Sequence, residues 1–168
     1  MKRSAFTIIE LMMVIAIISV LITIVSIIAK GAIRDARQER RVAIIKIVQE
    51  GINVYHAQKG EWPIAGLDRK SQQDNEEYYV LNESEVRQAM QKILDECKNG
   101  NPMFDVSGLF VSRDGKYGLD FFAAIRGTRK TSRKMKVSEM QFGYPDANGR
   151  FESLKMKYVA ASDQLLVY

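Results

Sequence analysis

A single carboxylate, Glu10, stands at the edge of a long apolar run near the start of the chain. Residues 11–29 after it contain no charge, no proline and no glycine. A carboxylate at membrane depth costs roughly 2.5–3.5 kcal/mol, so it usually has a partner. Cleavage before Phe6 would place a new amine four residues from Glu10, where the positive helix end adds to the attraction. The Phe6 amine and the Glu10 carboxylate would pair within one chain, or between staggered chains, where the pair would set their register. Alternatively, Glu10 has no such partner and reaches the lipid headgroups.

Residues that could form a catalytic set are few. His56 is the only histidine and Cys97 the only cysteine, so neither an internal disulfide nor a zinc site with several cysteines can form. The sequence has no glycine-rich loop of the kind that holds phosphate groups. We therefore expect no enzyme activity, and we expect Cys97 to be a buried structural thiol on the apolar face of a helix.

A tight loop near the C-terminus offers oxygen atoms to a cation. Asp146, Asn148 and Glu152 lie around Gly149, and calcium prefers carboxylate and amide oxygens. The spacing is not that of an EF-hand, and a β-turn explains Asp-x-Asn-Gly equally well. We expect no cofactor, and calcium at these three residues is the alternative.

A basic run offers a second candidate contact. Five of the nine residues from 126 to 134 are cations: Arg126, Arg129, Lys130, Arg133 and Lys134. A solvated, mobile loop between strands explains such a run. The alternative is a loop that binds the phosphate groups of nucleic acid, although no aromatic residue is interleaved for base stacking.

The apolar run is long enough to hold Glu10 at a membrane boundary. Its nineteen residues span roughly 28 Å as a helix, about the thickness of the hydrocarbon core. Lys2 and Arg3 favour a cytoplasmic N-terminus. The small residues Ser4 and Ala5 lie before the apolar run, whereas a secretory signal has its cleavage site after it, so the helix stays in the membrane. A plain signal anchor is the alternative interpretation.

Residues 5–18, AFTIIELMMVIAII, resemble the N-terminal motif of type IV pilins and type II secretion pseudopilins, and the similarity covers about residues 1–30. The resemblance implies cleavage between Ala5 and Phe6 by a membrane-bound prepilin peptidase, with N-methylation of the Phe6 amine. It also implies that Glu10 neutralises the Phe6 amine of a neighbouring subunit during assembly. Ala5 replaces the usual glycine of the family, and Ile27 replaces a helix-bending proline of many type IV pilins, so we expect a straighter helix.

The rest of the chain predicts an α+β fold in which a long N-terminal helix packs on a C-terminal antiparallel sheet. Apolar residues at three- and four-residue steps predict that the membrane helix continues to about residue 58, with its arginines mostly elsewhere on the surface. Asn82 and Glu85 predict a capping box for a second helix over 84–98. Residues 64–82 predict a loop with an acidic patch at Asp74, Glu76 and Glu77.

Turn residues divide the C-terminal half into strands and predict two hairpins, one with its turn at 113–116 and one with its turn at 145–150. We expect one sheet of four or five strands, built from residues 109–111, 118–122, 135–142, 151–159 and 164–168. The expected divisions of the chain are a leader at 1–5, a transmembrane and assembly half of the helix at 6–30, and a pilin-like periplasmic domain at 31–168.

These features together predict a structural subunit, a pseudopilin of a type II secretion-like filament in the bacterial inner membrane. Pilus subunits commonly close a C-terminal loop with a disulfide, so a single cysteine favours the pseudopilin over a type IV pilus subunit for adhesion or motility. A DNA-capturing minor pilin and a plain anchored periplasmic domain are further alternatives. The implied partners are other pilin-like subunits, prepilin peptidase, membrane lipid and the assembly machinery. Only the basic run suggests nucleic acid as a further partner.

Overall fold

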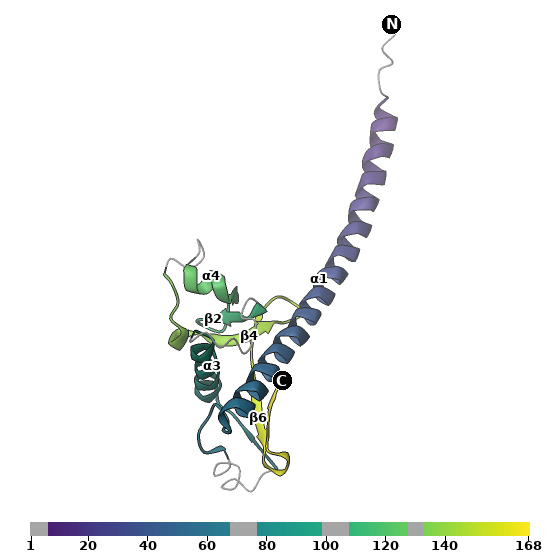
Figure 1. The fold of residues 1–168 in the computed structure, drawn as a ribbon. Helices are drawn as coiled ribbons and strands as arrows, with labels where there is room; N and C mark the ends of the chain where they lie inside the picture. The colour runs from purple at the N-terminus through teal and green to yellow at the C-terminus, as the bar shows by residue number, and fades with distance from the viewer. Residues whose placement is uncertain (1–6, 68–76, 99–107, 128–132) are drawn as a thin grey trace. The chain divides into compact units, whose positions relative to one another are not determined.

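The structure, a computed structural model, describes residues 7–67, 77–98, 108–127 and 133–168. The chain forms two compact units, Met1–Ala36 and Arg37–Tyr168. The first unit contains the N-terminal part of one long helix, and the second contains the rest of this helix and all the other described elements (Figure 1). The described residues confirm the expected α+β fold, with a long apolar N-terminal helix followed by antiparallel sheets.

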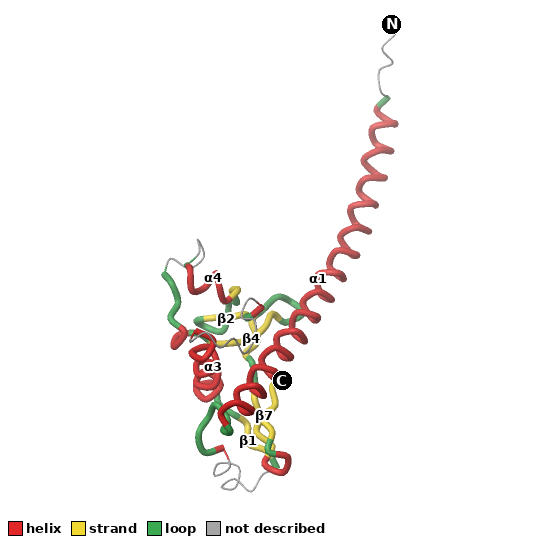
Figure 2. Tube along the Cα trace, viewed as in Figure 1, coloured by secondary structure: helices red, strands yellow, loops and turns green. Residues whose placement is uncertain are grey.

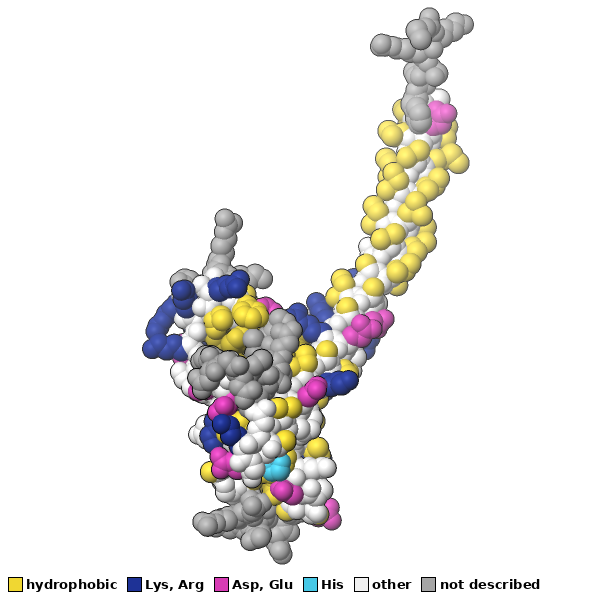
Figure 3. All heavy atoms as spheres, viewed as in Figure 1, with side chains coloured by type: hydrophobic (Ala, Val, Ile, Leu, Met, Phe, Trp, Pro, Cys, Tyr) yellow, Lys and Arg dark blue, Asp and Glu magenta, His cyan; other side chains and the backbone are white. Residues whose placement is uncertain are grey.

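The long helix α1 runs without interruption from Ile8 to Lys59, which confirms its predicted continuation to about residue 58. Apolar side chains cover the first part of the helix (Figure 3). Its hydroxyl side chains donate to carbonyl oxygens four residues earlier at 2.7–2.9 Å; they belong to Ser19, Thr23 and Ser26. Gly60 ends the helix, with its N–H donating to the His56 carbonyl at 2.8 Å and a φ of +71° that suits glycine.

The second helix, α3 (Glu83–Lys98), begins with the predicted capping box. The Asn82 side chain accepts a hydrogen bond from the Glu85 N–H at 3.0 Å, and the Glu85 carboxylate accepts one from the Asn82 N–H at 2.9 Å. Two backbone donors that have no partner inside the helix are satisfied in this way. The spacing of the two residues was therefore sufficient to place the start of the helix.

A short helix, α4 (Phe121–Arg126), replaces part of a predicted strand. The expectation of a strand over 118–122 is wrong beyond Asp120. The Asp120 carboxylate accepts a hydrogen bond from the Phe122 N–H at 3.0 Å, which caps a new helix at this point.

Seven short strands in the described residues form two antiparallel sheets rather than one (Figure 2). The three-stranded sheet has the order β1-β6-β7, with strands Tyr78–Val80, Met156–Val159 and Gln164–Val167. The four-stranded sheet has the order β3-β2-β4-β5, with strands Leu119–Asp120, Phe110–Ser112, Gln141–Pro145 and Phe151–Ser153.

The predicted strand at 151–159 is in fact two strands, β5 and β6, that belong to different sheets. Between them, the Leu154 N–H donates to the Phe142 carbonyl at 2.7 Å, and the Leu154 side chain is buried in the core. Lys155 instead exchanges backbone hydrogen bonds with Tyr168 at 2.9 and 3.2 Å. The expectation of a single sheet is wrong because these two consecutive residues pair with different parts of the chain.

Two further strand boundaries differ from the prediction. β1 lies inside the predicted loop 64–82 and is a strand because it pairs with β6, Tyr78 opposite Val159. The strand predicted at 135–142 begins only at Gln141, after the 3-10 turn η2 (Val137–Glu139). The two predicted hairpins, β2–β3 and β4–β5, are confirmed, and the predicted last strand is β7, which pairs with β6. In the expected acidic patch, Asp74 and Glu76 lie outside the described residues.

α1 enters the core of the second unit through one buried stripe, made by Ile44, Val48, Gly51, Ile52 and Tyr55. Beside the stripe, the Gln49 side chain pairs with the edge of β7. Its Nε2 donates to the Leu165 carbonyl at 2.8 Å, and its Oε1 accepts from the Val167 N–H at 2.8 Å. The Gln49 amide therefore hydrogen-bonds one backbone carbonyl and one backbone N–H of β7, as a neighbouring strand would do.

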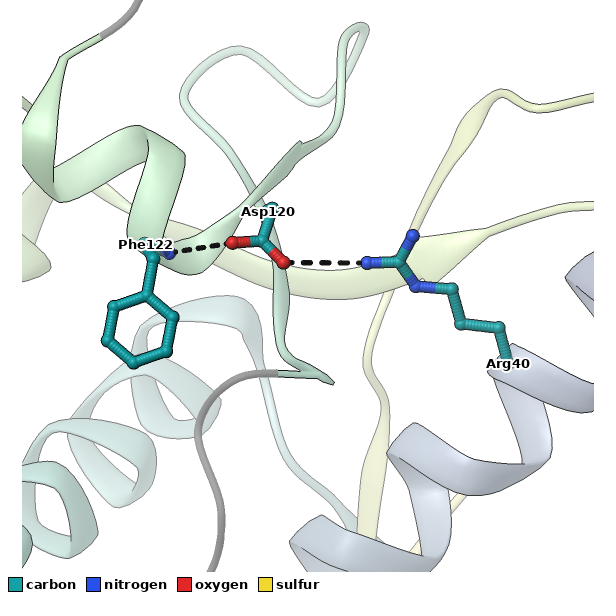
Figure 4. A network of polar contacts seen from close by, with 3 residues as sticks. All are labelled: Arg40, Asp120 and Phe122. Carbon is teal, nitrogen blue, oxygen red and sulfur yellow. Dashed lines mark hydrogen bonds and ion pairs between the residues drawn. The ribbon is translucent and has the colours of Figure 1, made fainter.

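Arg40 of α1 contacts the four-stranded sheet. Its guanidinium lies 3.7 Å from the Asp120 carboxylate and 5.0 Å from the centre of the Phe110 ring. Figure 4 shows Asp120 between Arg40 and the backbone N–H of Phe122, so one carboxylate both caps α4 and faces α1.

Two other arginines of α1 contact the β4–β5 hairpin. The Arg41 guanidinium lies 4.7 Å from the centre of the Tyr144 ring, and Arg37 donates to the Ala147 carbonyl at 3.1 Å. Arg37, Arg40 and Arg41 lie outside the buried stripe, as predicted, but their contacts with the sheet and the hairpin were not predicted. A guanidinium can stack on an aromatic ring and still keep part of its hydration.

A polar cluster joins the end of α1 to the β6–β7 turn. Trp62 stacks on His56 with ring centres 3.9 Å apart, and its Nε1–H donates to Asp163 at 2.8 Å. The Tyr158 hydroxyl donates to the same carboxylate oxygen at 2.9 Å. These two hydrogen bonds, that from Trp62 first, lower the pKa of Asp163.

Gln49→Leu should lower the free energy of unfolding by about 1–3 kcal/mol, because it leaves the Val167 N–H and the Leu165 carbonyl without their partner. Thermal unfolding of the detergent-solubilised full chain measures this effect. Glu50→Gln, at an exposed neighbouring position with no hydrogen bond or ion pair among the described residues, is the control and should change little. Equal stability of the two variants would contradict the role of Gln49.

The stabilisation by Asp163 should depend on pH. Because its pKa is lowered in the folded chain, its contribution is complete above about pH 3.9, the ordinary aspartate pKa, and is lost as the pH falls through the lowered value. Trp62, the only tryptophan, reports unfolding by fluorescence. The wild type should melt higher than Asp163→Asn at pH 6, and the difference should shrink below pH 4. A difference independent of pH would refute this assignment.

Candidate functional site

The first turn of α1 is organised by Thr7 and Glu10. The Thr7 N–H and the Thr7 hydroxyl both donate to Glu10 Oε2 at 2.8 Å, and the Glu10 N–H donates back to the Thr7 hydroxyl at 3.3 Å. These reciprocal bonds form a capping box at the start of the apolar helix. The sequence interpretation identified Glu10 but missed Thr7, although the Thr-x-x-Glu spacing is the signal that could have found it.

The two carboxylate oxygens of Glu10 are not equivalent. Oε2 accepts both hydrogen bonds from Thr7, whereas Oε1 accepts none within the described part of the chain. Glu10 is exposed on the helix surface. One oxygen of this carboxylate is thus fixed by its own chain, and the other can accept a donor from elsewhere.

The helix that follows Glu10 is apolar on every side. Every large apolar side chain from Ile8 to Ile28 is exposed, by between 42% and 79%. A helix without a polar face suits a lipid environment or the interior of a helix bundle. Among the described residues, α1 is the one helix whose length and apolar composition would allow it to cross a membrane.

The residues of the expected cleavage, Ala5 and Phe6, lie outside the described residues. Cleavage between them, methylation of the Phe6 amine and the pairing of that amine with Glu10 therefore stay predictions. The expected straighter helix also stays a prediction, although α1 continues without interruption past Ile27.

The basic run is only partly a loop. Arg126 is the last residue of α4, and its guanidinium lies 5.6 Å from the centre of the Phe122 ring, so the expectation of a loop is wrong at this position. Arg133 and Lys134 are exposed. Arg129 and Lys130 lie outside the described residues. Nucleic-acid binding by this run stays a prediction.

The loop at Asp146 has the geometry of a turn. Asp146 Oδ1 accepts hydrogen bonds from the N–H groups of Asn148 at 2.8 Å and Arg150 at 2.7 Å, and Gly149 has a φ of +81°. Glu152 follows within β5. The described residues contain no group of three or more His, Cys, Asp or Glu side chains placed to hold a metal ion. Calcium at Asp146, Asn148 and Glu152 stays an untested prediction.

The two residues considered for nucleophilic chemistry have structural contacts. Cys97, expected as a buried structural thiol, is half-buried and packs against the core. His56 stacks on Trp62. These contacts give both side chains a role in packing.

Comparison with known proteins identifies the N-terminal segment. Residues 1–26 match the family described as the prokaryotic N-terminal methylation motif. The chain therefore carries a type IV pilin-like signal of the prepilin type, which supports a subunit of the type IV pilin class. No curated protein and no solved structure gave a significant match to the chain.

Thr7→Val should loosen the first turn of α1, because it removes the hydroxyl group of the capping box while Glu10 stays charged. An N-cap contributes about 1 kcal/mol, so amide hydrogen exchange at Glu10 should speed up about fivefold in micelles. Thr23→Val is the matched control, because the Thr23 hydroxyl bonds back to Ser19 inside the helix and caps nothing. If both variants exchange like the wild type, the capping box does not stabilise this turn.

Proposed function

We propose that the chain is a pseudopilin, a structural subunit that assembles through α1 into a type II secretion-like filament at the bacterial inner membrane. The observation that carries the proposal is the half-satisfied Glu10 carboxylate at the start of an apolar helix, inside a matched N-terminal methylation motif. In this proposal the chain has no enzyme activity of its own.

Cleavage between Ala5 and Phe6 would expose an amine that needs an anionic partner in a medium of low polarity. Thr7 holds Oε2 of Glu10, which leaves Oε1 to accept the Phe6 amine of a neighbouring subunit. The capping box fixes the position of the carboxylate before the neighbour arrives, so less conformational freedom is lost on pairing. The spacing between amine and carboxylate would then set the stagger between adjacent helices.

The two basic residues before the apolar helix support the membrane orientation in this proposal. Lys2 and Arg3 favour a cytoplasmic N-terminus, which puts the second unit on the periplasmic side. Prepilin peptidase, membrane lipid and the assembly machinery are the partners that this topology requires.

A subunit of a type IV pilus is the second candidate. Both functions use the same N-terminal motif and the same apolar helix. The single cysteine favours the pseudopilin, because a C-terminal loop closed by a disulfide cannot form.

Glu10→Gln tests the proposal sharply, because glutamine can keep the capping box with Thr7 while the negative charge is removed. Membrane insertion should be normal, and recovery in sheared filaments should fall more than about tenfold, since an unpaired amine at membrane depth costs several kcal/mol. Immunoblots of the filament and membrane fractions measure both quantities.

Glu39→Gln, an exposed carboxylate further along α1, is the control for this experiment. Mass spectrometry of the membrane-bound chain should show a mature N-terminus at a methylated Phe6 in all three proteins, so a failure of cleavage cannot explain the result. Normal filament recovery of Glu10→Gln would exclude pairing with Glu10 as the basis of assembly.

A further inference from the structure

A groove of about 690 Å³ opens between α3, α4 and η2. Its lining is mostly apolar and comprises Leu94, Cys97, Phe122, Ile125 and Val137. Phe122, Ile125 and Val137 are half-buried, so part of their apolar surface faces the groove. A groove of this size accepts one or two large side chains of a binding partner.

Four cations lie at or near this groove. Lys136 is part of its lining, Arg126 ends α4, and Arg133 and Lys134 precede Met135, another lining residue. All four cations are exposed, and within the described residues none forms an ion pair with a carboxylate. Lysine and arginine side chains gather over the α4 end of the second unit in Figure 3. The groove therefore combines an apolar floor with a margin of exposed cations.

A surface of complementary type lies at the opposite end of the same unit. β1 is an edge strand, and its outward side chains Tyr78 and Val80 are 44% and 48% exposed. Glu77 precedes them, is exposed and has no hydrogen bond or ion pair among the described residues. Lys157 of the next strand lies 5.4 Å from the Tyr78 ring centre, so the only nearby cation on β6 is held against an aromatic ring.

In Figure 2, α4 and β1 lie at separate ends of the second unit, so the groove and the β1 edge belong to different elements. A single chain cannot close this contact on itself. A contact between two different surfaces of identical chains is heterologous, and it repeats from copy to copy.

We propose that the groove between α3, α4 and η2 binds the β1 edge of a second copy of this chain. Tyr78 and Val80 enter the apolar groove, and Glu77 faces the cations at its margin. This inference rests on the proposed function, because it supplies the contact between globular units of an assembled filament. A second copy fits better than nucleic acid, because phosphate groups would leave the apolar floor unfilled.

Cross-linking between copies tests this contact in the full chain. Val80→Cys adds one thiol at the β1 edge, and native Cys97 supplies the other in the groove. A short bis-maleimide applied to assembled filaments should give a ladder of dimers, trimers and larger products, because each copy carries both surfaces. The ladder should disappear in Val80→Cys with Cys97→Ser, and in Glu50→Cys, where the thiol lies on the exposed surface of α1 instead.

Exchanging the charges of Glu77 and Lys136 tests whether these two side chains pair across the proposed contact. In the Val80→Cys background, Glu77→Lys should reduce the ladder about fivefold at low salt, the size of effect expected for an exposed ion pair. Lys136→Glu alone should have the same effect, and the two changes together should restore the ladder. Glu50→Lys, a charge reversal outside both surfaces, should leave the ladder unchanged. Thermal unfolding of each variant confirms that the fold is retained.

The outcomes separate this inference from the proposed function. Filaments that depend on Glu10 but give no ladder would overturn the contact and leave the proposed function intact. A ladder restored by the charge exchange but unaffected by Glu10→Gln would support the contact and contradict Glu10-based assembly. If the four cations instead retard duplex DNA in a gel shift of the full chain, and no ladder forms, the groove margin is a nucleic-acid site and the inference is wrong.

Discussion

A backbone that can cross a hydrocarbon layer has to satisfy its own hydrogen bonds, and this constraint applies to α1, the one helix among the described residues that is long and apolar enough to do so. α1 meets it with an unbroken ladder from Ile8 to Lys59 and with hydroxyl groups that donate back to the same helix. The capping box of Thr7 and Glu10 satisfies the first donors, where no earlier turn exists. Because the helix is complete by itself, its C-terminal part is available as the scaffold on which the second unit folds.

That scaffold is held by three different kinds of contact. The apolar stripe ending at Tyr55 supplies the buried surface, Gln49 pairs with the edge of β7, and arginines lie over the rings of Phe110 and Tyr144. Apolar burial is not directional, whereas the amide pair fixes the register of β7 along the helix. The guanidinium groups contact the other sheet, so both sheets are oriented against the same helix.

Local patterns in the sequence predicted the features that depend on neighbouring residues. The length of α1, the cap of Asn82 with Glu85 and the two predicted hairpins all follow from spacing within a few residues. The division of 151–159 between two sheets did not, because Leu154 and Lys155 pair with residues far away in the sequence. β1 was missed for the same reason, and the contacts of Arg40 were not predicted because charge alone does not reveal an aromatic partner. At the N-terminus, Glu10 was found from its cost in lipid, while Thr7 was overlooked.

The pairing of Gln49 with β7 joins residues that are 116 and 118 positions apart. During synthesis, Gln49 emerges long before Leu165 and Val167. The second unit therefore cannot close on its helix until nearly the whole chain has been synthesised, and contacts of such high sequence separation form slowly. Until then, the apolar stripe of α1 is uncovered and can associate with other chains.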